Sequence, residues 1–278
     1  ADGTEFTFYL RKGLKWSDGQ PYTANDIEFW WNEVAYNKDI YPTGMEVIMS
    51  GGEMGKFTKV DDTTFKLKFK APYVLFLQRL AAPEGAYISS CPAHVAKQYH
   101  PNFADKAKLD EMVKAGSFKA WTELFTNKMG NHCQSFWSTD ARPTTYAWIN
   151  EKAAGPNSTQ VTFTRNPYYW KVDGEGNQYP YIDKITADVL QDVAALLLKV
   201  TNGEVDYQAR TFNTDANKPV VFDNQKKGDY KLVPLTKGDS NTVAIHFNMT
   251  SKDPVKRSVF QLKDFRIAMS YAINRQEV

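Results

Sequence analysis

Residues 4–34 contain three successive elements and constrain the fold more than any other part of the chain. Residues 4–10 alternate between apolar and polar side chains, which is the period of a half-buried strand. Residues 11–21 form a long turn marked by glycine and proline. Thr23 then begins a helix as its N-cap. The helix carries an apolar stripe at spacings of three, four and seven, made of Ile27, Trp30, Trp31 and Val34.

Three segments of the sequence resemble the bacterial extracellular solute-binding proteins of family 5, which serve ABC importers of oligopeptides and, in some branches, of oligosaccharides or nickel. Residues 10–31 read LRKGLKWSDGQPYTANDIEFWW, residues 165–183 read RNPYYWKVDGEGNQYPYID, and residues 265–275 read FRIAMSYAINR. They follow one another in the family order. The resemblance implies the first lobe of a two-lobed clamshell, the type II periplasmic-binding-protein fold, as a fragment without the second lobe.

The first half of the chain has the pattern of an antiparallel sheet with helices on one face, an α+β unit. Residues 57–70 are predicted to form a hairpin with its turn at Asp61 and Asp62. Residues 36–55 are too long for a simple connection and predict a functional loop or short helices. Further helices are predicted over residues 73–80, 93–99, 106–115 and 118–129.

The second half is predicted to be α/β. A strand over 184–190, a helix over 192–200 and a strand opening at 203 form the succession that builds a parallel sheet with a right-handed crossover. The other predicted elements are strands over 159–164, 230–235 and 242–247, a helix over 215–227, and a last helix with Asp264 as N-cap. The mixed α+β and α/β pattern divides the chain into an accessory α+β subdomain of the first lobe over residues 1–140 and a partial α/β core over residues 141–278, ending at the crossover to the missing second lobe.

Composition narrows the class of protein. The 278 residues are 42% hydrophobic and carry a net charge of +2, with no basic run that would bind nucleic acid. The sequence contains no run of about 18 apolar residues, the length that a membrane-spanning helix needs. The chain starts at Ala1 without Met and stops inside a helical pattern, so we expect a segment of a longer protein. The resemblance implies a monomer in the periplasm or outside the cell, with an ABC permease as its partner, and it allows a membrane anchor on the full-length protein.

No motif for catalysis, metal binding or a cofactor is present. His94 and His100 are too far apart to share a helix face, and Asp173, Glu175 and Asn177 lack the glycine and glutamate that complete a calcium loop. Nucleophile elbows and phosphate-binding loops are absent. We therefore expect no enzyme activity, no metal and no cofactor.

The sequence contains two cysteines, Cys91 and Cys133, whose spacing fits no metal motif. In an exported protein they can form one disulfide, whereas in a cytoplasmic protein they would be free and buried. The sequence leaves both possibilities open, because pairing requires that the two Cα atoms lie within about 7 Å.

Ligand-binding candidates lie after predicted strands and in an aromatic segment. Polar side chains just beyond the carboxyl ends of strands line clefts in α/β sheets, and aromatic side chains supply flat contact surfaces. The candidates are Trp137, Tyr146, Trp148, Asn150, Tyr207, Gln208, Arg210 and Asn248.

The leading interpretation is the substrate-binding component of an ABC importer that captures an oligopeptide and delivers it to a permease. An oligosaccharide is the alternative ligand, because the chain is rich in tryptophan. Two other classes stay open: an extracellular carbohydrate-active hydrolase with an aromatic cleft, and a structural or adhesion module. Because half a cleft cannot exclude water from its ligand, we expect these 278 residues alone to bind weakly or not at all.

Overall fold

The computed structural model describes residues 2–130, 133, 142–151, 155, 157–212, 214–235 and 244–277. The chain divides into two compact units, which are described separately below. Unit 1 comprises Ala1–Gln191 and unit 2 comprises Asp192–Val278. The predicted subdomain boundary at residue 140 lies inside unit 1 and stays a prediction.

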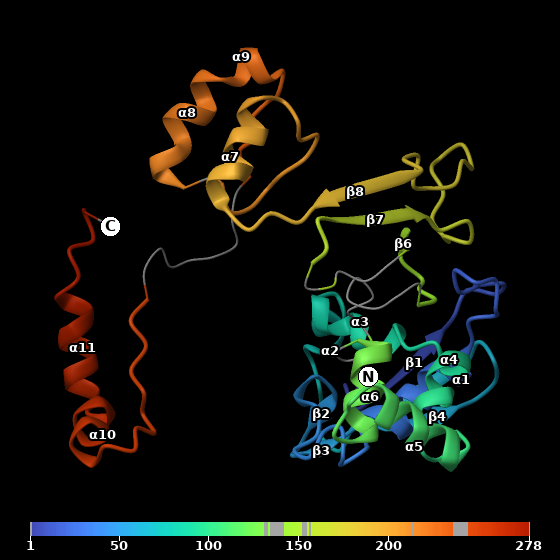
Figure 1. Ribbon diagram of the computed structural model, residues 1–278. Helices are drawn as coiled ribbons and strands as arrows, with labels where there is room; N and C mark the ends of the chain where they lie inside the picture. Colours follow the sequence, from blue (N-terminus) through green and yellow to red (C-terminus); the bar gives the residue numbers. More distant parts are fainter. Residues whose placement is uncertain are drawn as a thin grey trace. The chain divides into compact units, whose positions relative to one another are not determined.

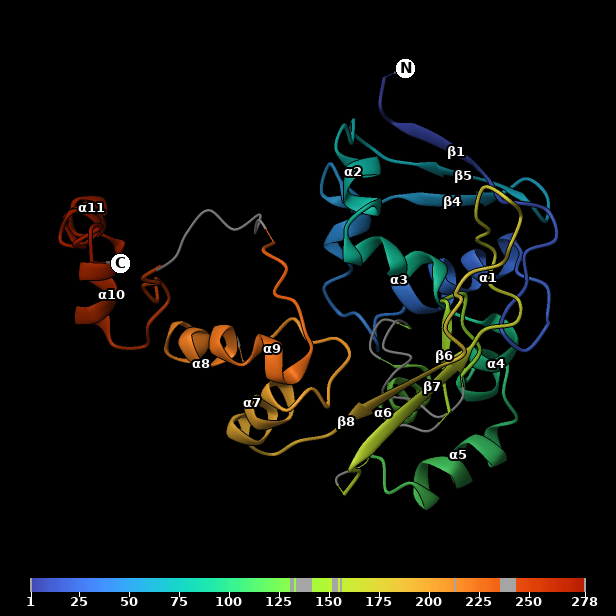
Figure 2. The same cartoon turned by 90° about the horizontal axis from the view of Figure 1, so that it is seen from above.

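Unit 1 is built on a three-stranded antiparallel sheet in the order β1-β5-β4. The strands are β1 (Glu5–Tyr9), β4 (Lys56–Lys59) and β5 (Thr64–Lys68), which confirms the predicted first strand and the hairpin. Phe8 lies opposite Phe65 in the register, and their rings stack at 5.0 Å. The alternating apolar residues therefore cover one face of the sheet, and Figure 2 shows α1 and α3 on one side of these strands.

The predicted helix after Thr23 is present and continues further than a regular α-helix. It consists of α1 (Ala24–Phe29) followed by a π-helical segment, η1 (Trp30–Ala35). Thr23 is the N-cap, and the Asp26 carboxylate accepts from the Thr23 backbone N–H at 2.9 Å, which completes a capping box. The same carboxylate accepts from the Ala93 N–H at 3.0 Å, so it also joins the helix to the segment that starts α4.

The core of unit 1 gathers around the apolar stripe of this helix. Trp30 and Trp31 are buried, and the Trp31 indole N–H donates to the Gly55 carbonyl at 2.8 Å. A side chain on Gly55 would lie 2.5 Å from the Phe69 ring, so only glycine fits between the two aromatic residues. The other large buried side chains include Trp16, Ile27, Ile48, Leu67, Phe76 and Met129.

The remaining elements of unit 1 are short, and the helices predicted between residues 73 and 129 are confirmed with shifted ends. Residues 36–55 contain a 3-10 helix and a two-stranded hairpin. The alternative that predicted short helical structure in this segment is therefore confirmed. In chain order these elements are η2 (Glu46–Ile48), β2 (Met49–Ser50), β3 (Glu53–Met54), α2 (Phe76–Leu80), η3 (Pro83–Gly85), α3 (Ala86–Ser89), α4 (Ala93–Ala96), η4 (Lys97–Tyr99), α5 (Lys106–Ala115) and α6 (Trp121–Met129).

A second antiparallel sheet, β6-β7-β8, completes unit 1 (Figure 1). Its strands are β6 (Trp148–Asn150), β7 (Gln160–Arg165) and β8 (Lys184–Asp188). The predicted strand over 184–190 is therefore present, but it pairs antiparallel with β7. The predicted parallel crossover is wrong for the described residues, because residues 204–206 are not a strand and have no neighbour to pair with.

All regular elements in the described part of unit 2 are helices, and irregular segments join them. Its elements are α7 (Val193–Thr201), η7 (Asp215–Asn217), α8 (Lys218–Asp223), α9 (Gln225–Gly228), α10 (Pro254–Gln261) and α11 (Lys263–Tyr271). The predicted strands over 230–235 and 242–247 are absent from the described part, residues 230–235 and 244–247. A strand exists only as one member of a hydrogen-bonded ladder, and β-rich composition does not supply the second member. Asp264 lies in the first turn of α11 and is not its N-cap, which is Leu262; α10, with Asp253 as N-cap, was not predicted.

Candidate functional site

Two of the segments that resemble family 5 pack against each other within unit 1. They are residues 10–31, called the first signature below, and residues 165–183, called the second signature. The Arg11 guanidinium lies 5.2 Å from the centroid of the Trp170 ring, and the Lys15 ammonium lies 5.1 Å from that of Tyr168. Gly19 has a φ of +85°, and a Cβ there would lie 3.2 Å from the Tyr168 hydroxyl. Aromatic side chains of the second signature therefore pack on the turn of the first signature.

Asn166 of the second signature holds the segment that leads into β6. Its side chain is fully buried, and Nδ2 donates to the Tyr146 carbonyl at 2.8 Å. Its Oδ1 accepts from the Tyr168 N–H at 2.9 Å, and its backbone N–H donates to the Ala147 carbonyl at 2.9 Å. One buried amide thus satisfies several backbone groups and positions residues 144–147.

Three predicted ligand-binding residues lie in the segment that Asn166 holds or in the strand β6 that follows it. Tyr146 and Trp148 are half-buried, and Asn150 is buried at the end of β6. The indole N–H of Trp148 is enclosed and has no hydrogen-bond partner among the residues that the structure describes. The structure therefore brings these three residues together along one short segment, and a role in ligand binding stays a prediction. Trp137, the fourth candidate of this group, lies outside the described residues.

The other four candidates belong to unit 2 and lie on irregular chain. Tyr207 is 81% exposed, and the Gln208 amide donates to the Arg210 carbonyl at 2.8 Å within the same loop. The side-chain Oδ1 of Asn248 accepts from the backbone N–H and the hydroxyl of Thr250, both at 3.1 Å, and forms a local turn. They were expected at the ends of strands, and no strand precedes them in the described residues. Their ligand contacts stay predictions.

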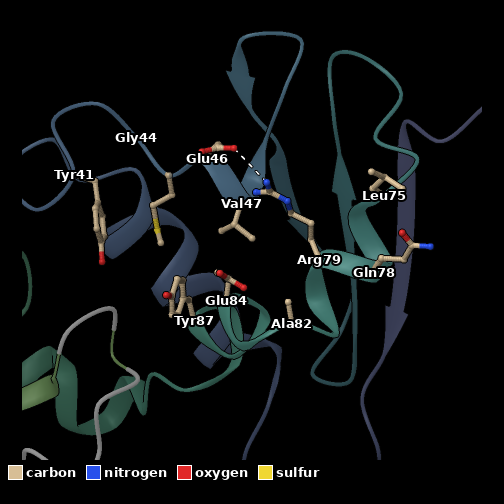
Figure 3. A pocket seen from close by; sticks show the side chains of 11 residues that line it. Tyr41, Gly44, Glu46, Val47, Leu75, Gln78, Arg79, Ala82, Glu84 and Tyr87 are labelled. Atoms are coloured by element: carbon tan, nitrogen blue, oxygen red, sulfur yellow. Dashed lines mark hydrogen bonds and ion pairs between the residues drawn. The ribbon is translucent and has the colours of Figure 1, made fainter. Parts of the chain in front are cut away.

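One concave surface in the described part of unit 1 was not predicted from sequence. It is a pocket of about 620 Å³ between the loop that leads into η2 and the segment from α2 to α3 (Figure 3). This volume is within the range of small-molecule sites. The lining residues are Tyr41, Gly44, Met45, Glu46, Val47, Leu75, Gln78, Arg79, Ala82, Glu84 and Tyr87.

The pocket combines an apolar interior with a charged rim. Met45 and Val47 are buried, and the Tyr73 hydroxyl donates to the Val47 carbonyl at 3.3 Å. At the rim the Arg79 guanidinium donates to the Glu46 carboxylate at 3.3 Å (Figure 3). Burial raises the pKa of Tyr41, so its hydroxyl stays protonated and able to donate at neutral pH. The only sequence signal for this site was the unusual length of the 36–55 segment.

The arrangement fits binding and shows no reactive group. Among the described residues no cluster of three or more histidine, cysteine or acidic side chains lies close enough to hold a metal ion. Asp173 of the rejected calcium loop instead accepts from the backbone N–H groups of Glu175 and Asn177, and these bonds and that from the Tyr181 hydroxyl lower its pKa. None of the helices described here is long and apolar enough to cross a membrane.

Comparison with known proteins establishes the class and then the family. The fold is that of part of a type II periplasmic binding protein: an oligopeptide-binding protein OppA of known structure superimposes with a TM-score of 0.77 and 35% identity, over 99% of this chain and 42% of that protein. The chain belongs to the bacterial extracellular solute-binding proteins of family 5, because the model for the middle region of that family matches residues 1–278.

Two curated relatives extend this comparison. The periplasmic alpha-galactoside-binding protein of Rhizobium meliloti is 30% identical over 186 residues, which are 66% of this chain and 23% of that protein. A probable ABC transporter-binding protein of Deinococcus radiodurans is 27% identical over 286 residues, covering 99% of this chain and 42% of the relative. The chain thus spans less than half the length of the relatives it matches.

Proposed function

We propose that this chain belongs to the substrate-binding component of an ABC importer, which captures a solute outside the cytoplasmic membrane and delivers it to a permease. The observation that carries this proposal is the match of the solute-binding family over the whole chain. The periplasmic names of two relatives support a location in the periplasm or outside the cell. We propose that the protein works as a monomer.

An oligopeptide is the proposed solute. The protein of known structure with 35% identity over nearly the whole chain is an oligopeptide-binding protein. An oligosaccharide is the second candidate, because the relative with 30% identity over two thirds of the chain is named for alpha-galactosides. Exposed aromatic side chains serve both ligands, since they stack on sugar rings as readily as they pack against peptide side chains.

Native mass spectrometry of the whole gene product, purified without denaturation, tests this proposal. A peptide ladder in the bound fraction is the expected result, and bound galactosyl oligosaccharides would favour the second candidate. After unfolding and refolding to remove bound solute, calorimetry should give a Kd in the micromolar range or below for the identified class. If neither class binds, the importer proposal fails.

The same titration, repeated on residues 1–278, tests the expectation that this part of the protein binds weakly by itself. We expect no micromolar binding of either ligand class, because the chain covers 42% of the oligopeptide-binding protein and a half-open site leaves polar contacts exposed to water. Micromolar binding by the 278 residues would show that this part of the protein contains a complete site.

Alanine variants of three tyrosines distinguish the candidate surfaces. Tyr87 lines the pocket, Tyr146 precedes β6, and Tyr207 lies in the unit 2 loop. The variant at the true contact should weaken binding by the loss of an aromatic anchor, roughly 10-fold or more. Tyr9, 79% exposed on an edge of the first sheet, supplies the control. Equal affinities for all four variants would exclude these three surfaces.

A further inference from the structure

Two cysteines from separate segments of unit 1 meet in its core. Cys91 immediately precedes the proline that starts the α4 segment, and Cys133 follows α6. They are 42 positions apart, and the Cys91 thiol contacts the Cys133 sulfur at 2.6 Å. Each residue is 1% exposed, and both belong to the same buried cluster. The fold therefore delivers two sulfur atoms to each other from distant parts of the chain.

Arg142 holds the backbone of both segments in place. It is buried, and its Nη1 donates to the Ser90 carbonyl at 3.1 Å and to the Cys133 carbonyl at 2.6 Å. The Nη1 of Arg142 thus links the backbone of Ser90, which precedes Cys91, to the backbone of Cys133. Cys133 also has a φ of +55°, a conformation that glycine or asparagine adopts more readily. Cys133 therefore occupies a backbone position that does not favour a cysteine.

The described surroundings of the two cysteines favour a structural role over the other common roles of a cysteine pair. No third metal ligand accompanies the two sulfurs among the residues that the structure describes. Burial raises the pKa of the Cys91 thiol, and the nearby Arg142 charge opposes this only in part. Because the thiolate is the nucleophile and the metal ligand, a buried neutral thiol suits neither catalysis nor metal binding.

We propose that Cys91 and Cys133 are joined by an intramolecular disulfide that clamps the segment from α4 to α6 to the core of unit 1. The two S–H bonds break and one Sγ–Sγ bond forms. Two protons and two electrons pass to the disulfide of a thiol–disulfide oxidoreductase, which is reduced to a dithiol. The proposal rests on the proposed extracellular or periplasmic location, because structural disulfides persist in oxidising compartments.

The bond would act mainly on the unfolded chain. Closing a loop of this length removes many of the conformations open to the reduced, unfolded protein. From the dependence of stabilisation on loop length, we expect reduction to lower the Tm of unit 1 by on the order of 10 °C. All seven tryptophans lie before residue 191, so tryptophan fluorescence follows this transition. A Tm unchanged by reduction would overturn the clamping role.

Oxidation of the purified, fully reduced protein in a glutathione redox buffer tests the pairing directly. We expect both thiols to disappear together, a mass loss of about 2 Da, and a cross-linked tryptic product containing residues 80–97 and 129–152. These peptides end at lysine, and the Arg142–Pro143 bond resists trypsin. Glutathione adducts on separate cysteines, or two thiols that persist in the oxidised buffer, would overturn the proposal.

The variant Cys91→Ser is the matched control and should lose the cross-linked product while keeping the fluorescence of folded unit 1. If it does not fold, the double variant Cys91→Ala/Cys133→Ala replaces it, since two small apolar residues suit the buried site. In a second experiment, the protein is alkylated directly in extracts of the cells that naturally produce it. If both thiols are free in the extract but the disulfide forms in the glutathione buffer, the result would contradict the proposed location and support the pairing of Cys91 with Cys133. Blocked thiols and the cross-linked peptide would support both.

Discussion

Unit 1 and unit 2 differ sharply in how much apolar surface they bury. Unit 1 encloses a continuous aromatic core around Trp16, Trp30 and Trp31. The buried cluster of unit 2 consists of Val200, Phe212 and Val221. Unit 2 instead exposes large apolar side chains, among them Leu198 at 61%, Val233 at 73% and Tyr271 at 81%.

The difference shows that an apolar stripe on a helix creates a core only when another surface covers it. The stripe of α1 and η1 belongs to one buried cluster with residues of the first sheet and with Phe76 of α2, whose ring centroid lies 4.8 Å from that of Phe69. In unit 2, α7 has a comparable stripe that packs against α8 and α9 over a small area. Because stabilisation follows the buried apolar area, we expect unit 1 to dominate the measured stability of these 278 residues.

The largest predicted effect tests the core of unit 1. Trp31→Ala removes a buried indole and its hydrogen bond to Gly55, so it should lower the free energy of unfolding by about 3–5 kcal/mol. Denaturant titration followed by tryptophan fluorescence measures this. Trp170→Ala, at a partly exposed position, should cost about 1 kcal/mol or less. Similar losses in both variants would contradict the assignment of the core.

A smaller loss is expected where the second signature supports the segment before β6. Asn166→Ala leaves the buried carbonyl of Tyr146 and the N–H of Tyr168 without their side-chain partner, at a cost of about 2–3 kcal/mol. Asn177→Ala, in the exposed turn of the same signature, should change stability by about 0.5 kcal/mol or less. The same denaturant titration separates the two, and equal effects would remove the structural role given to Asn166.

The third prediction concerns unit 2 alone. Val221→Ala removes two buried methyl groups and should destabilise unit 2 by about 1 kcal/mol, detected as a shifted helix signal in circular dichroism. Tryptophan fluorescence should not change, since it reports unit 1. Val233→Ala, at an exposed position, should leave both signals unaltered. A shift of the fluorescence transition by Val221→Ala would show that the two units unfold together.

The smallest predicted effect is a pH dependence that originates in unit 1. The side chain of His100 is fully buried; its Nε2 lies 3.1 Å from the Glu33 carbonyl, and its Nδ1 accepts from the Asn102 N–H at 3.3 Å. Burial lowers the pKa of His100, and the N–H of Asn102, which donates to Nδ1, favours the neutral ring. The Glu33 carboxylate, 3.9 Å from Nδ1, and the Glu33 carbonyl oppose this shift only in part.

Because the pKa of His100 is lower in the folded state, the unfolded chain binds the proton first as pH falls. Stability should therefore be complete above the ordinary histidine pKa of about 6.5 and decrease as pH falls below it. Denaturant midpoints between pH 7.5 and 5 measure this slope. His100→Gln should flatten it, while His246→Gln, at an exposed position, controls for the loss of one histidine. An unchanged slope in His100→Gln would assign the pH dependence to other groups.

Much of unit 1 could be predicted because its signals are local. Three confirmed features depend only on residues that are close together in the sequence: Thr23 as N-cap, the stripe from Ile27 to Val34, and the hairpin at Asp61. The strands predicted in unit 2 failed for the complementary reason. Residues 230–235 have the composition of a strand, but a ladder needs a second segment at the correct distance, which composition does not specify.

The sites divide in the same way. The sequence by itself determined the family and the strand and capped helix within residues 4–34. It also predicted which residues contact a ligand, and this stays a prediction. Only the tertiary structure decided that Arg11 and Lys15 pack on Trp170 and Tyr168, that Tyr41 and Tyr87 line one pocket, and that Cys91 meets Cys133. These pairs are far apart in sequence, and their proximity depends on how the whole of unit 1 packs.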